Sequence, residues 1–119
     1  MIHPGDFMKP KFTESKTGSF VLEWVVPESL PYFEGHFPNH PVLPATAIVD
    51  FSLEAIKEAA KNPSLEIKSL KLGKFYEIIG PRQYVEIRLT EKSAKEWEIA
   101  WFGVRPSEKR LAKLHFEFF

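Results

Sequence analysis

Hydrophobic and polar residues alternate over several stretches of this chain, as they do in strands with one buried face. The first stretch places four apolar side chains on one side: Phe20, Leu22, Trp24 and Val26. Three more stretches alternate in the second half of the chain, at residues 85–90, 96–104 and 109–119. A longer extended stretch, expected to be bent or bulged, covers residues 66–79. We therefore predict five strands, preceded by an irregular arm over residues 1–18.

Residues 45–60 follow a different pattern, which predicts a helix of about four turns. Pro44 suits the start of a helix because its missing N–H is not needed there, and Asn62-Pro63 marks the end. Apolar residues cover more than one narrow stripe of this helix, so we expect a sheet to wrap around it. The remaining stripe is polar and consists of Asp50, Glu54, Lys57, Glu58 and Lys61.

The order of these elements is strand, loop, helix and four strands, which predicts an α+β fold with one helix packed on an antiparallel sheet. At 119 residues the chain is expected to form a single domain over residues 1–119. Little of the chain is left to cover the edge of the sheet. An uncovered edge favours pairing with a second copy.

The composition narrows the classes of function. Sixteen Lys and Arg residues balance sixteen Asp and Glu residues, so the chain has no electrostatic footprint for nucleic acid or a membrane surface. No stretch predicts a transmembrane helix or a signal peptide, which fits a cytoplasmic location. The absence of cysteine excludes a thiolate nucleophile and a Cys-based zinc site. The eleven Phe, three Trp and three Tyr residues suit a core, an apolar tunnel or a dimer face.

A proline-rich segment separates the first strand from the helix. Five of the ten prolines lie between positions 27 and 44, which predicts a shaped loop, because proline removes a backbone donor. The loop carries His36, and Asp50 follows fourteen residues later on the helix. A histidine base and a carboxylic acid are the groups needed to move two protons on one small substrate. The alternatives are a structural histidine, or a metal pair with His40 that the intervening Pro38 disfavours.

Two motifs around this histidine are similar to those of a known family. Gly35-His36-Phe37-Pro38, then Pro41-Val42-Leu43-Pro44, then the acid at position 50, resemble the β-hydroxyacyl-acyl-carrier-protein dehydratases of hotdog fold. Lys74-Phe75 followed by Gly80-Pro81 is similar to the Arg-Phe and Pro-Gly elements of the family's next strand. The short chain resembles the small dehydratase-like proteins of aryl-polyene pathways.

The resemblance implies a curved antiparallel sheet around the central helix, in a homodimer or dimer-built oligomer. His36 of one subunit and Asp50 of the other would share an active site at the interface. The substrate would be a β-hydroxyacyl thioester on the phosphopantetheine arm of an acyl-carrier protein, with no metal or organic cofactor. A cis peptide would join His36 and Phe37.

The family's chemistry assigns roles to residues of this chain. His36 would remove the proton next to the thioester carbonyl, and Asp50 would protonate or orient the leaving hydroxyl group. The free N–H groups near Ala45 and Thr46 would stabilise the enolate-like oxygen, helped by the helix dipole. Further substrate contacts are expected from Phe33, Gly35, Phe37, Pro44, Phe51, Glu54 and Tyr76.

The chain departs from the family at several positions. Ala45 stands where the family usually has glycine, and Glu54 stands where it often has glutamine. Asn39 and His40 replace the small or basic residues often found after the His-Phe-Pro motif. These departures leave two other functions open, a hotdog thioesterase that relies on a helix carboxylate and water, and a non-catalytic acyl-binding protein. The order of residues does not fit the Asp-before-His motif of MaoC-type hydratases.

Overall fold

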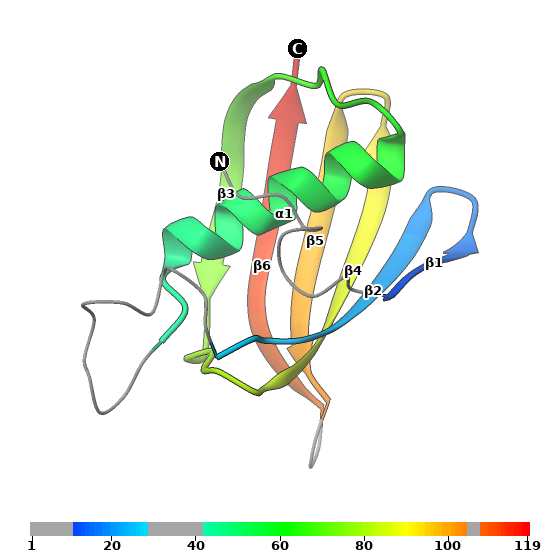
Figure 1. Cartoon of the computed structure of the whole chain (residues 1–119). Helices are drawn as coiled ribbons and strands as arrows, with labels where there is room; N and C mark the ends of the chain where they lie inside the picture. The colour runs from blue at the N-terminus through cyan, green and yellow to red at the C-terminus, as the bar shows by residue number, and fades with distance from the viewer. Residues whose placement is uncertain (1–10, 29–41, 105–107) are drawn as a thin grey trace.

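The computed structural model describes residues 11–28, 42–104 and 108–119. Six strands form one antiparallel sheet in the order β1-β2-β4-β5-β6-β3, and helix α1 lies across one face of it (Figure 1). The elements are β1 (Lys11–Lys16), β2 (Ser19–Val25), α1 (Ala45–Ala60), β3 (Ile67–Phe75), β4 (Tyr84–Ser93), β5 (Glu96–Gly103) and β6 (Lys109–Phe118). The α+β prediction is therefore confirmed.

The helix and the alternating strands agree with the sequence pattern. The helix begins and ends at the predicted residues, and strands β4, β5 and β6 bury every second side chain. These buried side chains face α1 and form the core with it. The alternating pattern predicts the buried face correctly because each of these strands has one face on the helix and the other in solvent.

The first strand, β1, was missed by the sequence analysis, which predicted an irregular arm over residues 1–18. Residues Lys11–Lys16 instead pair antiparallel with β2. Their sequence, KFTESK, contains one apolar residue and so offers no alternating pattern. The strand forms because its backbone groups complete the hydrogen-bond ladder of β2, which local sequence does not reveal.

Three aromatic side chains connect the helix to the sheet. The ring of Phe51 on α1 stacks on Trp24 with centroids 4.4 Å apart, and both rings meet Trp101 edge-on. The indole Nε1–H of Trp101 donates a 2.9 Å hydrogen bond to the hydroxyl of Ser52 on the same helix. This bond satisfies the only polar atom of the Trp101 side chain, so the ring can be fully buried.

Strand β3 lies at one edge of the sheet, next to β6 (Figure 1). Two register shifts interrupt its ladder, between Ile67 and Ser69 and between Leu70 and Leu72. These irregularities confirm the predicted bulging of the 66–79 stretch, although its last residues, 76–79, leave the strand. The sheet ends at β1 on one side and at β3 on the other, whereas the C-terminal strand β6 lies inside it.

Candidate active site

Among the described residues, no side chain caps the N-terminal end of α1. Pro44 is the N-cap residue and forms no side-chain capping hydrogen bond, and the first turn contains no acidic side chain. The N–H groups of Ala47 and Ile48 both donate to the Pro44 carbonyl, at 3.0 and 3.2 Å. The two preceding N–H groups, of Ala45 and Thr46, point out of the helix start. No side chain of this turn offsets the positive end of the helix dipole.

A pocket of about 550 Å³ adjoins this helix end. One wall comes from the segment before the helix and its first turns, and the other comes from the end of β3 and the residues after it. The lining residues are Val42, Leu43, Pro44, Ala45, Ile48, Phe75, Tyr76, Glu77 and Ile78. A 2.7 Å hydrogen bond from the Leu43 N–H to the Ile79 carbonyl holds the two walls together. The walls are mainly apolar, which suits the hydrocarbon part of an acyl group.

The predicted acid, Asp50, is exposed on the second turn of α1. Glu54, one turn further on, is buried with 6% of its surface exposed, and its carboxylate lies 3.7 Å from the Lys57 ammonium group. The two carboxylates therefore differ in environment although they share one stripe of the helix. Lys57 balances the charge of the buried carboxylate, which lowers the cost of its burial.

Three of the predicted site residues meet in the pocket, namely Pro44, Ala45 and Tyr76. Thr46 is exposed beside them. Phe51 does not line this pocket, because its ring points into the core against Trp24. His36, Gly35, Phe37 and Phe33 lie outside the described residues, as do the expected cis peptide and His40.

Sequence analysis missed several residues of the pocket wall, among them Ile48, Phe75 and Ile78. Residues 66–79 were expected to form one extended strand, which would have directed alternate side chains away from the helix. The chain leaves the ladder after Phe75, and the Tyr76 N–H bonds to the Leu111 carbonyl at 2.8 Å. The Gly80-Pro81 pair was the available indication that the strand ends early.

A second pocket, of about 370 Å³, lies between the C-terminal half of α1 and the start of β3. Its lining combines apolar side chains with two charged ones: Leu53, Lys57, Leu65, Glu66, Ile67 and Phe118. Both pockets thus lie where α1 meets the edge strand. Within the described ranges, no three His, Asp or Glu side chains gather closely enough to bind a metal ion. The same residues contain no helix long and apolar enough to cross a membrane.

Comparison with known proteins identifies the family of this chain. The family model "ApeI-like: ApeI dehydratase" matches residues 12–114, and the chain belongs to this family. The predicted family is therefore confirmed. Dehydratases of this family are hydro-lyases, which is the class of enzyme that was predicted.

Individual relatives agree with the family assignment. A 3-hydroxyacyl-[acyl-carrier-protein] dehydratase FabZ from Wolbachia pipientis wMel is 32% identical over 57 residues, which cover 43% of this chain and 40% of that protein. The match therefore spans less than half the length of that curated relative.

Solved structures define the fold as a hotdog fold, as predicted. The dehydratase heterocomplex ApeI:P from Xenorhabdus doucetiae has a TM-score of 0.75 at 16% identity, covering 93% of this chain and 98% of the matched chain. The dehydratase domain of PpsC from Mycobacterium tuberculosis has a TM-score of 0.70 at 13% identity, covering 92% of this chain and 42% of the matched chain.

Proposed function

We propose that this protein removes water from β-hydroxyacyl thioesters carried on an acyl-carrier protein and releases trans-2-enoyl thioesters for lipid or polyene synthesis. The observation that carries the proposal is the apolar pocket at the uncapped start of α1 in a chain of the ApeI-like dehydratase family. The pocket accommodates the carbon chain, while the helix start offers N–H groups to a thioester oxygen.

The reaction needs two proton transfers. His36 takes the proton from the carbon next to the thioester carbonyl, and the electron pair moves toward the carbonyl oxygen. The N–H groups of Ala45 and Thr46 stabilise the negative charge that develops on that oxygen. As the carbonyl re-forms, the β-hydroxyl group leaves with a proton from Asp50, given directly or through water. Proton balance is restored when His36 returns its proton to Asp50 through solvent. These steps use no metal or organic cofactor.

We propose that two copies pair through the free edge of β3, in a homodimer or a dimer-built oligomer. Ile67 and Leu70 on this strand are 41% and 40% exposed. Exposed apolar side chains on an unpaired edge strand favour pairing with another chain. Asp50 is also exposed, so a second copy would have to cover it to exclude water from the reaction. Each site would then combine His36 of one subunit with Asp50 of the other, in the cytoplasm.

Conversion of β-hydroxyacyl carrier substrates, followed by mass spectrometry, tests this function. Wild type is expected to remove one water from the acyl group, while His36→Ala and Asp50→Asn lose about 10²- to 10⁴-fold in rate. Glu58→Gln is the matched control, because Glu58 is an exposed carboxylate on the same helix outside the pocket. Release of free acid would identify a thioesterase. Tight binding without any turnover would identify an acyl-binding protein.

A further inference from the structure

Both ends of the segment between β2 and α1 are hydrogen-bonded to the turn that leads into β4. At the first end, the Val26 N–H donates to the Gln83 carbonyl at 2.9 Å, and the Val26 carbonyl accepts from the Arg82 N–H at 2.6 Å. At the second end, the Leu43 N–H donates to the Ile79 carbonyl at 2.7 Å. This turn therefore fixes where the chain leaves β2 and where it enters α1.

The turn, residues 79–83, enters β4 through a β-bulge. Arg82 and Gln83 together oppose the single residue Val26, just beyond the β2–β4 ladder. Arg82 has a φ of 65°, a left-handed conformation that is unfavourable for a residue with a Cβ. A residue persists in such a conformation only where the surrounding contacts hold it there. Bulges are over-represented next to active sites, where they redirect the chain.

The side chain of Gln83 closes the turn on itself. Its Oε1 accepts a 3.1 Å hydrogen bond from the Gly80 N–H, and Gly80 directly follows Ile79, whose carbonyl binds Leu43. The amide nitrogen of Gln83 lies beside Gly103 on β5, where an added Cβ would come within 3.3 Å of Nε2. The missing side chain at Gly103 thus leaves the space that the amide group occupies.

The same turn connects the two walls of the pocket at the helix start. Ile79 follows Ile78, which lines the β3 wall, and Leu43 belongs to the opposite wall. The side chains of Leu43 and Ile79 are only 6% and 1% exposed, so core packing holds both partners of their hydrogen bond. After Leu43 come the N-cap Pro44 and then Ala45, whose N–H has no acceptor within the helix. A shift of the turn would therefore move the N–H groups of the helix start relative to the pocket wall.

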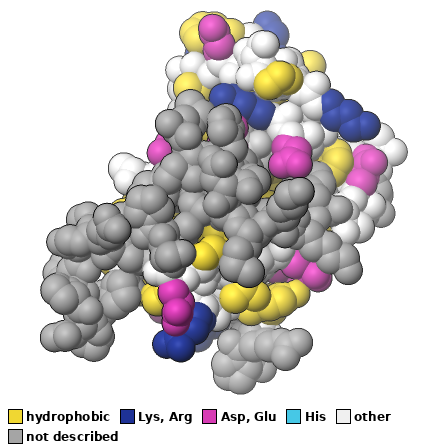
Figure 2. All heavy atoms as spheres, in the orientation of Figure 1, with side chains coloured by type: hydrophobic (Ala, Val, Ile, Leu, Met, Phe, Trp, Pro, Cys, Tyr) yellow, Lys and Arg dark blue, Asp and Glu magenta, His cyan; other side chains and the backbone are white. Residues whose placement is uncertain are grey.

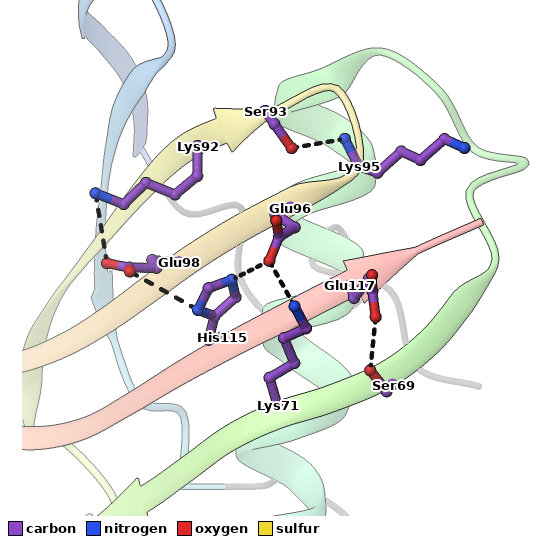
Figure 3. A network of polar contacts seen from close by, with 9 residues as sticks. All are labelled: Ser69, Lys71, Lys92, Ser93, Lys95, Glu96, Glu98, His115 and Glu117. Carbon is purple, nitrogen blue, oxygen red and sulfur yellow. Dashed lines mark hydrogen bonds and ion pairs between the residues drawn. The ribbon is translucent and has the colours of Figure 1, made fainter.

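A local need of the turn does not account for this arrangement. Ser93 meets such a need in the turn between β4 and β5, where its hydroxyl accepts a 3.3 Å hydrogen bond from the Lys95 N–H (Figure 3). That turn joins two neighbouring strands, and neither residue lines either of the two pockets. The 79–83 turn instead bonds to two elements that are not its neighbours along the chain, the end of β2 and the start of α1. Its shape therefore affects the helix start as well as the turn itself.

We propose that Gln83 is a positioning residue for the dehydration: its bond to Gly80 holds the turn, and the turn holds the start of α1 against the pocket wall. The inference rests on the proposed function. The segment between β2 and α1 also carries His36, and both of its attachment points, Val26 and Leu43, bond to this turn. In this role Gln83 does not contact the substrate. It acts on the rate through geometry, because a misplacement of catalytic groups by about 1 Å costs up to about 10²-fold.

Two substitutions of Gln83 separate its hydrogen bond from its bulk. Gln83→Met keeps an unbranched side chain of similar length without the acceptor, and Gln83→Glu keeps an acceptor oxygen. On a β-hydroxyacyl carrier-protein substrate, Gln83→Met should lower kcat about tenfold and change KM by less than about twofold, because the pocket walls are retained. Gln83→Glu should keep the wild-type kcat. Ser93→Ala is the matched control, because it removes a side-chain-to-backbone bond from a turn outside the pockets and should leave kcat unchanged.

Thermal unfolding distinguishes positioning from a general loss of structure. Gln83→Met and Ser93→Ala each lose one hydrogen bond in a turn, so their melting temperatures should fall by similar small amounts. An equal kcat in these two variants, measured well below both melting temperatures, would overturn the inference. So would a raised KM with unchanged kcat, which would assign Gln83 to substrate binding. A Gln83→Glu variant as slow as Gln83→Met would contradict the role of the acceptor oxygen.

Amide hydrogen exchange measures the coupling between Gln83 and the helix start without any turnover. The Leu43 N–H should exchange about tenfold faster in Gln83→Met than in wild type, because the Ile79 carbonyl is no longer held in place. The amides of Ile99 and Leu114, on strands paired on both sides, should be unchanged. An unchanged Leu43 rate would overturn the inference even in an active enzyme. If wild type dehydrates no substrate, the proposed function is wrong, and the Leu43 rate alone decides whether Gln83 holds the helix start.

Discussion

Helix α1 contacts the sheet in two different ways along its two sides. Over β4, β5 and β6 it covers a dry core, in which Trp101, Leu114 and Ile99 are completely buried. Toward the edge strand the apolar side chains stay accessible, with 44% of Tyr76 and 73% of Ile78 exposed. Hydrophobic side chains also reach the surface at several places in Figure 2. Similar residue types therefore serve two purposes: the interior side stabilises the fold, and the edge side is available to a substrate or a partner.

The difference follows from where strand pairing ends. Each strand of the interior has a neighbour on both sides and the helix above it, so its inward side chains lose their contact with water. Strand β3 has β6 on one side only, and both of its faces remain partly open. An exposed apolar strand beside a pocket is a common feature of binding surfaces. Four experiments test this contrast.

The largest effect is expected in the interior. Trp101→Ala should lower the free energy of unfolding by about 3–5 kcal/mol, because it leaves a cavity and removes the partner of Ser52. Tyr76→Ala, an aromatic truncation at the edge, should cost less than about 1 kcal/mol. Urea denaturation of the two variants measures both values. Equal losses would contradict the division into a stabilising side and an accessible side.

A charge on the edge strand should disrupt assembly without unfolding the chain. Leu70→Glu is expected to convert a dimer into monomers, because the carboxylate would have to be buried in the β3–β3 pairing of two copies. Sedimentation velocity gives the mass of the assembly, and circular dichroism checks the fold. Lys68→Glu changes the charge of the same strand at an exposed position and serves as the control. A dimer that survives Leu70→Glu must use a different surface.

Polar substitutions in the pocket wall should weaken binding of the acyl chain. Ile78→Ser is expected to raise KM about tenfold for a long-chain substrate, since each lost CH₂ contact is worth about 0.8 kcal/mol. A short-chain substrate that does not reach Ile78 should be unaffected. Val25→Ser is the matched control, because Val25 is an exposed aliphatic residue outside the pocket. An equal change for both chain lengths would mean that the wall does not contact the acyl group.

The smallest effect concerns the ion pair that connects β3 to β5. Because Lys71 lowers the pKa of Glu96, the pair stabilises the fold above pH 4.5, the ordinary pKa of the carboxyl group, and this contribution is lost as pH falls through the lowered value. Because the pKa of Lys71 is raised above 10.5, its contribution is complete below pH 10.5 and is lost above the raised value.

Replacement of Lys71 tests whether the ion pair stabilises the fold only within this pH range. Lys71→Met should therefore lower the melting temperature slightly between these two pH values, and the difference should disappear as pH falls through the lowered pKa of Glu96. Thermal unfolding across the pH range measures the difference from wild type. Lys92→Met, which removes a longer 3.8 Å ion pair on the same face, should have a smaller effect at neutral pH. A Lys71→Met effect that keeps its size after Glu96 is protonated would show that packing of the side chain, and not charge, is responsible.

Much of the interior was predictable from local pattern, and much of the edge was not. The helix bounds follow from Pro44 and Asn62-Pro63, and the buried faces of β4, β5 and β6 follow from strict alternation. The bulges of β3 blur its alternation, so the sequence did not reveal that residues 76–79 leave the ladder and form a pocket wall. Strand β1 lacked an apolar pattern altogether. The assignment of His36 and Asp50 as catalytic residues stays a prediction.

The sequence by itself determined the helix, the inward faces of the strands and the family, because each depends on residues close together along the chain. The tertiary structure decided that β3 forms one edge of the sheet, where the pocket lies, and that Lys74 on β3 lies opposite Lys113 on β6. These features depend on the pairing of β3 with β6, which joins residues as distant as Ser69 and Glu117. Pairing over such separations is chosen by the packing of the whole sheet against α1, and no local pattern encodes it.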